Sequence, residues 1–180
     1  VPVENYLFRP ATWIDRNRPV FSCRIGINSG KMVVGNMGSD KVFDYTVMGD
    51  GVNLSARLEG ANKKYGTRLL ISQATYDLLS KEAFKTRVVD VIKVKGKRQA
   101  VRVYEVYGYS GRTGQSHKDQ YAQIYEKAFL QYLDKNFDQA AQGVKQALEI
   151  FPKDLAASQM LERTEKINYN TLGMNWDGSI

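Results

Sequence analysis

Cysteine and histidine are almost absent from this 180-residue sequence, which has one of each, Cys23 and His117. A single cysteine excludes an internal disulfide framework, and this pair is too small a set for a cysteine- and histidine-based zinc site. We therefore expect a reducing, cytoplasmic environment, for a separate protein or for the cytoplasmic part of a membrane-anchored one. No apolar run approaches the roughly 20 residues of a membrane-spanning helix, and the first residues lack the apolar stretch of a signal peptide.

Acidic residues are fewer than basic ones, 19 against 26, which leaves a net charge of +7. This excess favours an anionic partner such as a nucleotide, a nucleic acid or a membrane surface. The basic residues are scattered, without the aromatic-interleaved stripe of a nucleic-acid binder, so we expect no nucleic-acid partner. With 43% hydrophobic residues and only four prolines, the chain is neither a disordered segment nor a proline-rich linker.

Hydrophobic periodicity divides the chain into five parts. Residues 1–19 hold three of the four prolines and form an irregular lead-in. Residues 20–109 alternate between strand-like and helix-like patterns, which predicts an α+β fold. Residues 110–116 are rich in glycine and serine and predict a linker. Residues 117–168 are helical, and residues 169–180 form a tail.

Within the α+β part, strands and helices are expected to follow one another closely. Alternation from Val20 to Asn28 predicts a half-buried strand whose inward face holds Phe21, Cys23, Ile25 and Ile27. Glycines in residues 30–40 predict a turn, a short helix or strand, and a second turn. Further strands are expected at residues 43–48, 68–72, 88–94 and 101–107. Helices are expected at 52–65, stopped by Gly66, and at 73–83, capped by Ser72 with Leu78 and Leu79 inward.

The C-terminal part has a helical period. Aromatic and aliphatic residues recur at spacings of three and four from Tyr121 to Leu133, and small apolar residues do so from Ala140 to Leu148. Pro152 ends this second helix, and Asp154 begins a third. The prediction is a helical hairpin followed by the start of another helix, without the second copy that a solenoid requires.

The segment Asp44 to Glu59 carries the most chemical information. Asn53 and Arg57 are four residues apart on the predicted helix, so their side chains share a face. An amide and a guanidinium on one exposed face suit a sugar hydroxyl and a phosphate. Two ordinary interpretations are open at this point: Arg57 pairs with a nearby carboxylate, and Asn53 caps the helix.

The run from Arg24 to Gly60 resembles the second half of the catalytic domain of class III adenylate/guanylate cyclases. The matching elements are Arg24-Ile25-Gly26-Ile27, Ser29-Gly30, Gly35-Asn36, Asp44-Tyr45-Thr46-Val47-Met48-Gly49-Asp50 and Val52-Asn53-Leu54-Ser55-Ala56-Arg57-Leu58-Glu59. The likeness continues through residues 69–72 and 94–106 to about Gly108, and many fixed spacings agree in order. It implies a partial nucleotidyl cyclase domain of the ferredoxin-like palm type.

This resemblance implies ATP as the substrate, Mg²⁺ or Mn²⁺ as the cofactor, and a homodimer with composite sites at the subunit interface. Arg57 would stabilise negative charge on the phosphate in the transition state, and Asn53 would orient the ribose. Thr46 falls at the purine-reading position, where threonine favours ATP over GTP, unless it is an ordinary strand threonine. Lys97 would reach the triphosphate, or else belong to a solvated hairpin turn.

The two metal-binding aspartates of the family have no match in this sequence. The family carries them upstream of the Arg24 strand, and Asp15, the only aspartate before residue 40, has neither of the expected settings. Asp44 and Asp50 are not assigned to metal. We therefore expect the ligands upstream of this chain, an adenylate cyclase as the intact product, and little or no activity from the chain alone. The alternative is a non-catalytic, cyclase-like dimerisation or regulatory module.

The helical part resembles a single tetratricopeptide unit. Its best matches are Asn136-Phe137-Asp138, Ala140, Ala147-Leu148-Glu149 and Pro152. Two roles are open for it: recognition of a protein partner, or docking of its apolar stripe on the cyclase part. The end, Asn175 to Gly178, resembles a short tail motif of bacterial cyclases.

Overall fold

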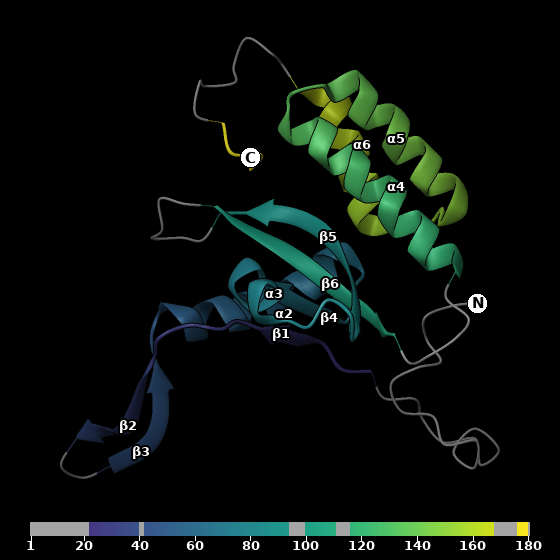
Figure 1. Ribbon diagram of the computed structural model, residues 1–180. Coiled ribbons are helices and arrows are strands. Elements are labelled where there is room, and N and C mark those ends of the chain that lie inside the picture. The colour runs from purple at the N-terminus through teal and green to yellow at the C-terminus, as the bar shows by residue number, and fades with distance from the viewer. Residues whose placement is uncertain (1–21, 40–41, 94–99, 111–115, 168–175, 180) are drawn as a thin grey trace.

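The computed structural model describes residues 22–39, 42–93, 100–110, 116–167 and 176–179. Up to Tyr109 the described chain consists of strands with the helices α2 and α3 among them, and three helices follow (Figure 1). The elements are β1 (Ile25–Ile27), β2 (Val33–Ser39), β3 (Val42–Met48), α2 (Asp50–Tyr65), β4 (Leu69–Ser72), α3 (Gln73–Leu78), β5 (Phe84–Ile92), β6 (Val101–Tyr109), α4 (Ser116–Leu133), α5 (Phe137–Ile150) and α6 (Leu155–Lys166). The predicted α+β class is confirmed.

Four strands form one sheet in the order β1–β4–β6–β5. β1 and β4 run parallel because α2 crosses between them, and β6 is antiparallel to both β4 and β5. Cross-strand pairing places a row of four residues on one face of the sheet: Gly26, Leu70, Glu105 and Arg87. Helix α2 contacts the Gly26 end of this row, and α4 and α6 contact the Arg87 end.

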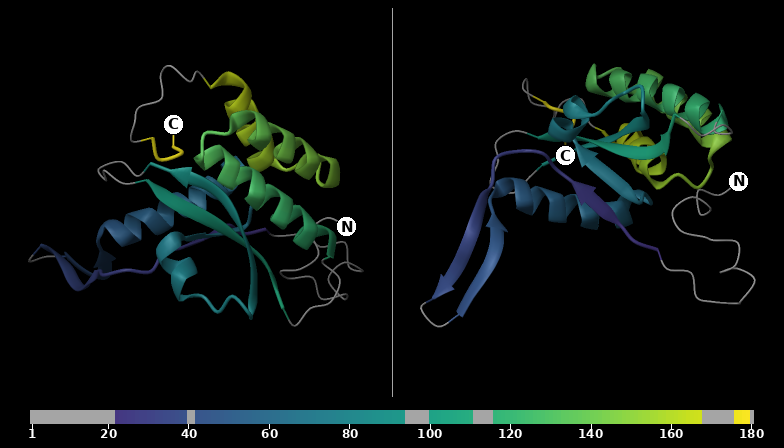
Figure 2. Two further views of the ribbon diagram at one scale, coloured as in Figure 1. Left: turned by 45° about the horizontal axis from the view of Figure 1, so that its top comes forward. Right: turned by 60° about the horizontal axis from the view of Figure 1, so that its bottom comes forward.

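Strands β2 and β3 form a separate antiparallel hairpin. The hairpin extends away from the sheet in every view (Figures 1 and 2). Its large apolar side chains are exposed, with Val33, Val42 and Phe43 at 63–66% and Tyr45 at 77%. Of the two forms expected between Gly30 and Asp40, a short helix or a strand, the structure has the strand, β2. The apolar surface of the hairpin has no partner within the described part of the chain.

Helices α4, α5 and α6 form a layer beside β5 (Figure 1). Tyr121, Tyr125, Phe129 and Tyr132 recur along α4 and are at most 1% exposed. Tyr125 donates its hydroxyl hydrogen to the carbonyl oxygen of Val89 on β5 at 2.8 Å. The structure therefore favours docking of this segment on the sheet over partner recognition. None of the described helices, including the 18-residue α4, is long and apolar enough to cross a membrane.

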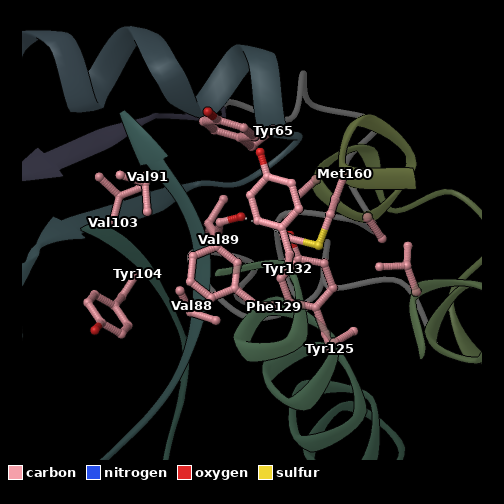
Figure 3. Close-up of a cluster of buried hydrophobic side chains, with 14 of the residues drawn as sticks. Tyr65, Val88, Val89, Val91, Val103, Tyr104, Tyr125, Phe129, Tyr132 and Met160 are labelled. Atoms are coloured by element: carbon pink, nitrogen blue, oxygen red, sulfur yellow. Dashed lines mark hydrogen bonds between the residues drawn. The ribbon is translucent and has the colours of Figure 1, made fainter. Parts of the chain in front are cut away.

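A single hydrophobic core joins the sheet to these helices (Figure 3). Val89 and Val103 of the sheet and Met160 of α6 are fully buried, and Tyr65 of α2 reaches the same cluster. The third helix of this segment is more than the start that the sequence indicated, since α6 has twelve residues. Its N-cap, Asp154, accepts the N–H of Ala157 at 2.8 Å. The helical segment therefore shares its core with the sheet, in agreement with the docking alternative and not with a separate helical unit.

Two expectations about buried faces are wrong. Cys23, Ile25 and Ile27 are exposed, because α2 covers the opposite, Gly26 side of a β1 strand that is only three residues long. The helix after Ser72 ends at Leu78, which is 77% exposed, and does not reach residue 83. Leu79 has an extended backbone conformation, so the helix cannot continue past it. The cap at Ser72 is confirmed by the bond that its hydroxyl accepts from the N–H of Thr75.

Candidate active site

Helix α2 presents Asn53 and Arg57 on its solvent-exposed side. The buried side of the helix is formed by Leu54, Leu58, Asn62 and Tyr65. Because successive residues turn by about 100°, Asn53 and Arg57 lie one turn apart on the same exposed face. An amide and a guanidinium are therefore displayed together, where a ligand outside the described chain can meet both.

The capping interpretation of Asn53 is wrong. The N-cap of α2 is Gly49, which has no side chain to offer, and the N–H groups of Val52 and Asn53 bond to its carbonyl oxygen at 3.1 and 3.3 Å. Asn53 lies inside the first turn, with its side chain exposed. Its amide is thus not needed to begin the helix.

The middle of α2 is held close to β1. A Cβ on Gly26 would lie 2.3 Å from the amide nitrogen of Glu59 and from the carbonyl oxygen of Ser55, so only glycine permits this approach. The buried Asn62 amide donates to the carbonyl oxygen of Ile25 at 3.0 Å and to that of Leu58 at 2.9 Å. These contacts fix the face that carries Asn53 and Arg57 relative to the sheet.

Thr46 lies on a different element from that pair. It is half-buried in the middle of β3, opposite Gly35 of β2, and β3 leads through Gly49 into α2. The ordinary interpretation, a strand threonine, stays open beside the purine-reading one. Lys97 lies outside the described residues, so its predicted contact with the triphosphate stays a prediction.

A cavity of about 820 Å³ lies beside the first turn of α2. It is lined by Asn28, Asp50, Gly51 and Leu54, among other residues, whereas Asn53 and Arg57 are not part of its lining. The candidate pair therefore lies outside this cavity, on the exposed face of α2.

The described residues do not fit a divalent metal site. No group of three or more His, Cys, Asp or Glu side chains that could hold a metal ion occurs in the parts of the chain that the structure describes. Mg²⁺ is usually bound through one or two carboxylates together with substrate phosphates and water, and Asp44 and Asp50 sit on separate elements, β3 and the start of α2.

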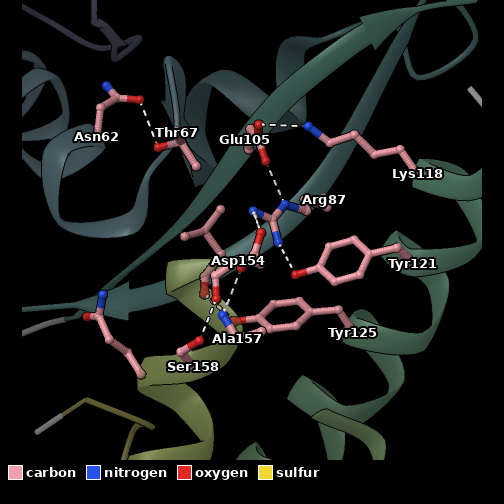
Figure 4. Close-up of polar contacts among 12 residues, drawn as sticks. Asn62, Thr67, Arg87, Glu105, Lys118, Tyr121, Tyr125, Asp154, Ala157 and Ser158 are labelled. Atoms are coloured by element: carbon pink, nitrogen blue, oxygen red, sulfur yellow. Dashed lines mark hydrogen bonds and ion pairs between the residues drawn. The ribbon is translucent and has the colours of Figure 1, made fainter. Parts of the chain in front are cut away.

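Buried charges that the sequence reasoning missed connect the sheet to the helical segment (Figure 4). Arg87 on β5 donates from Nε to Glu105 at 2.6 Å, from Nη1 to Tyr121 at 2.6 Å and from Nη2 to Asp154 at 2.7 Å. Lys118 also pairs with Glu105, at 3.1 Å. Burial disfavours the charge on Glu105, but Arg87 and Lys118 outweigh it and lower the pKa of this carboxyl. The available signal was the presence of charged residues among the apolar ones of two strands, Arg87 and Asp90 on β5 and Glu105 on β6.

The described elements form an α+β domain in which α2 displays an amide and a guanidinium on one exposed face. Residues 11–108, which are 98 of the 180, match the adenylate and guanylate cyclase catalytic domain family. The chain belongs to this family.

Its similar proteins include adenylate cyclases from several bacteria. Adenylate cyclase 1 of Rhizobium meliloti is 44% identical over 90 residues, 50% of this chain and 13% of that protein. Adenylate cyclase of Anabaena cylindrica is 43% identical over 90 residues, 49% of this chain and 18% of that protein. The crystal structure of the adenylyl cyclase CyaB from P. aeruginosa has 37% sequence identity over 53% of this chain and 48% of that chain, with a TM-score of 0.43. The chain thus spans less than a fifth of the length of these two curated relatives.

Proposed function

We propose that this protein is part of an adenylate cyclase that converts ATP to cyclic AMP and pyrophosphate in intracellular signalling. The proposal depends chiefly on Asn53 and Arg57, which are exposed one turn apart on a helix fixed to the sheet of a cyclase-family domain. The two curated relatives described above carry the name adenylate cyclase. The single, unpaired Cys23 supports a cytoplasmic location, where ATP is available.

In this proposal Arg57 acts on the phosphate and Asn53 on the ribose. The ribose 3′-hydroxyl loses its proton to solvent and its oxygen bonds to the α-phosphorus, while the bond from this phosphorus to pyrophosphate breaks. Negative charge grows on the α-phosphate oxygens. The Arg57 guanidinium donates to these oxygens and stabilises that charge, and the Asn53 amide orients the ribose. Thr46 reads adenine, accepting from its amino group or donating to a ring nitrogen, and Lys97 contacts the triphosphate.

The metal-binding half of the site is proposed to lie upstream of this chain. The absence of a metal-ligand group from the described residues supports this. For the same reason we propose that the chain alone has little or no cyclase activity, with Mg²⁺ or Mn²⁺ held by the upstream residues in the joined protein.

Two apolar surfaces support assembly with further protein. Phe43 and Tyr45 on the β2–β3 hairpin are 63% and 77% exposed, and we propose that two copies associate through this hairpin. Ile25 and Ile27, 39% and 41% exposed, lie on β1 at the edge of the described sheet. An upstream segment that packs on this face of β1 would cover them.

The test joins this chain to an upstream segment that bears both aspartates and measures cyclic AMP formed from Mn²⁺–ATP. We expect Arg57→Ala to lower kcat by roughly 10²–10³-fold, because it removes a donor to the developing charge. Lys63→Ala, which removes an exposed cation from the last turn of the same helix, should leave kcat unchanged.

Two outcomes would contradict the proposal. No turnover from the joined protein, or an equal loss in the two variants, would favour the non-catalytic dimerisation module. Cyclic AMP above background from the 180-residue chain alone would show that the proposed inactivity is wrong.

A further inference from the structure

The last turn of α2 is bonded to the helical segment through a buried carboxylate. Tyr65, 1% exposed at the end of α2, donates its hydroxyl hydrogen to Asp90 on β5 at 2.6 Å. Arg163 on α6 contacts both oxygens of the same carboxylate: Nη1 donates to Oδ1 at 2.9 Å, and Nη2 forms an ion pair with Oδ2 at 2.9 Å. The N–H of Val91 also donates to this carboxylate, at 2.8 Å. The carboxylate of Asp90 thus links α2, β5 and α6 at one point.

Two further contacts join α6 to the same end of α2. Gln159 donates from Nε2 to the carbonyl oxygen of Lys64 at 2.7 Å, and this is one of the terminal carbonyls that have no partner within a helix. Leu155 lies against Gly66, the left-handed residue that ends α2. The two are so close that a Cβ on Gly66 would be 3.3 Å from the Leu155 side chain. Three separate contacts therefore hold the C-terminal end of α2.

Helix α6 is itself fixed to the sheet. Asp154, its N-cap, accepts from Arg87 of β5 at 2.7 Å and from the N–H of Ala157 (Figure 4). Arg163 is more than four-fifths buried, with 18% of its side chain exposed. Burial disfavours its charge, but Asp90 outweighs burial and raises the pKa of Arg163. The support that α6 offers is thus a charged, bidentate contact in a poorly solvated place.

We propose that α6 holds α2 in its working orientation and that Arg163 is a positioning residue for Asn53 and Arg57, acting through Asp90 and Tyr65. Tyr65 lies eight residues beyond Arg57, about 12 Å along a stiff helix, so a tilt at this end displaces the Arg57 side chain. The catalytic part of the inference rests on the proposed function, whereas the mechanical link between α6 and α2 does not.

The mechanical link is tested by amide hydrogen exchange in the 180-residue chain. Arg163→Met should speed exchange of residues 58–65 by about tenfold or more, because it removes a hydrogen-bonded charged partner. Lys166→Met is the matched control, since it removes an exposed cation from the same helix, whose pair with Glu162 lies at the surface. Tyr65→Phe, which removes one hydroxyl and keeps the ring, should speed exchange in the same residues by a smaller factor.

The functional part is tested by kinetics of the joined cyclase. Arg163→Met should lower kcat by about tenfold with little change in KM, because a displaced group weakens transition-state contacts more than ground-state binding. Arg163→Lys, which keeps a cation beside Asp90, should restore part of kcat. A helix that merely added stability would lower the amount of folded enzyme and leave kcat per folded molecule unchanged.

The outcomes are distinguishable. Unchanged exchange of residues 58–65 in both Arg163→Met and Tyr65→Phe would overturn the link. Faster exchange with a kcat equal to that of Lys166→Met would overturn the positioning role. A joined protein whose turnover is unaffected by Arg57→Ala would contradict the proposed function instead, while the exchange result would still decide whether α6 holds α2.

Discussion

Replacing Arg87 with methionine tests whether buried charges hold the helical segment on the sheet. The Arg87 side chain is 2% exposed, and its guanidinium bonds to Glu105, Tyr121 and Asp154 at 2.6–2.7 Å. Methionine retains much of the apolar stem and removes the charge. The change therefore leaves two carboxylates without the cation that they share.

The expected loss is about 3 kcal/mol of unfolding free energy. Removing one partner of a buried ion pair costs about 3–5 kcal/mol, because the remaining charge is uncompensated. Lys118 still pairs with Glu105, and Asp154 still accepts from Ala157, so the lower end of that range applies here. At about 2–4 °C per kcal/mol for a domain of this size, the melting temperature should fall by about 6–12 °C.

Urea and thermal unfolding followed by circular dichroism provide the measurement. Lys145→Met is the control, because its pair with Glu165 has side chains 59% and 54% exposed and should contribute less than about 0.5 kcal/mol. The double variant Arg87→Met, Glu105→Gln should be less unstable than the sum of the single changes, since it also removes an uncompensated carboxylate. If Arg87→Met lowers the free energy of unfolding by no more than Lys145→Met does, the buried charges do not hold the helical segment on the sheet.

Three further predictions concern packing, pH and assembly. Gly26→Ala should cost about 2 kcal/mol or more in urea unfolding, because its Cβ would meet α2 backbone at 2.3 Å, whereas Gly35→Ala, with nothing within 4 Å, should cost far less. The pKa of Glu105 is lowered in the folded state, so the stability that its charged form contributes is full above the ordinary pKa of 4.5 and is lost as the pH falls below that value. Glu105→Gln should therefore make the free energy of unfolding depend less on pH between about pH 3 and 7. Phe43→Glu on the exposed hairpin should weaken self-association of the joined protein in sedimentation experiments, and unchanged association would exclude this surface as the interface.

The candidate site could be predicted from the sequence to the extent that it depends on neighbours in the chain. Asn53 and Arg57 are one helical turn apart, so helical periodicity alone put them on one face. Gly66 marked the end of the helix because it can adopt the left-handed conformation that terminates it. The inward face of β1 was predicted wrongly, because alternation separates two faces of a strand and does not say which face a helix will cover. Here α2 covers the Gly26 face, the side that can be approached most closely.

By itself, the sequence indicated most of the local elements, the shared face of Asn53 and Arg57 on α2 and the resemblance to the cyclase family, because these depend on the order and spacing of residues along the chain. Only the tertiary structure decided that the helical segment shares the core of the sheet and that Arg87, Asp90 and Glu105 are buried. A charge in a strand is stable in the interior only where opposite charges converge on it. The partners of Arg87 and Asp90 on α6 lie 67 and 73 residues away in the chain, a convergence that no local pattern contains.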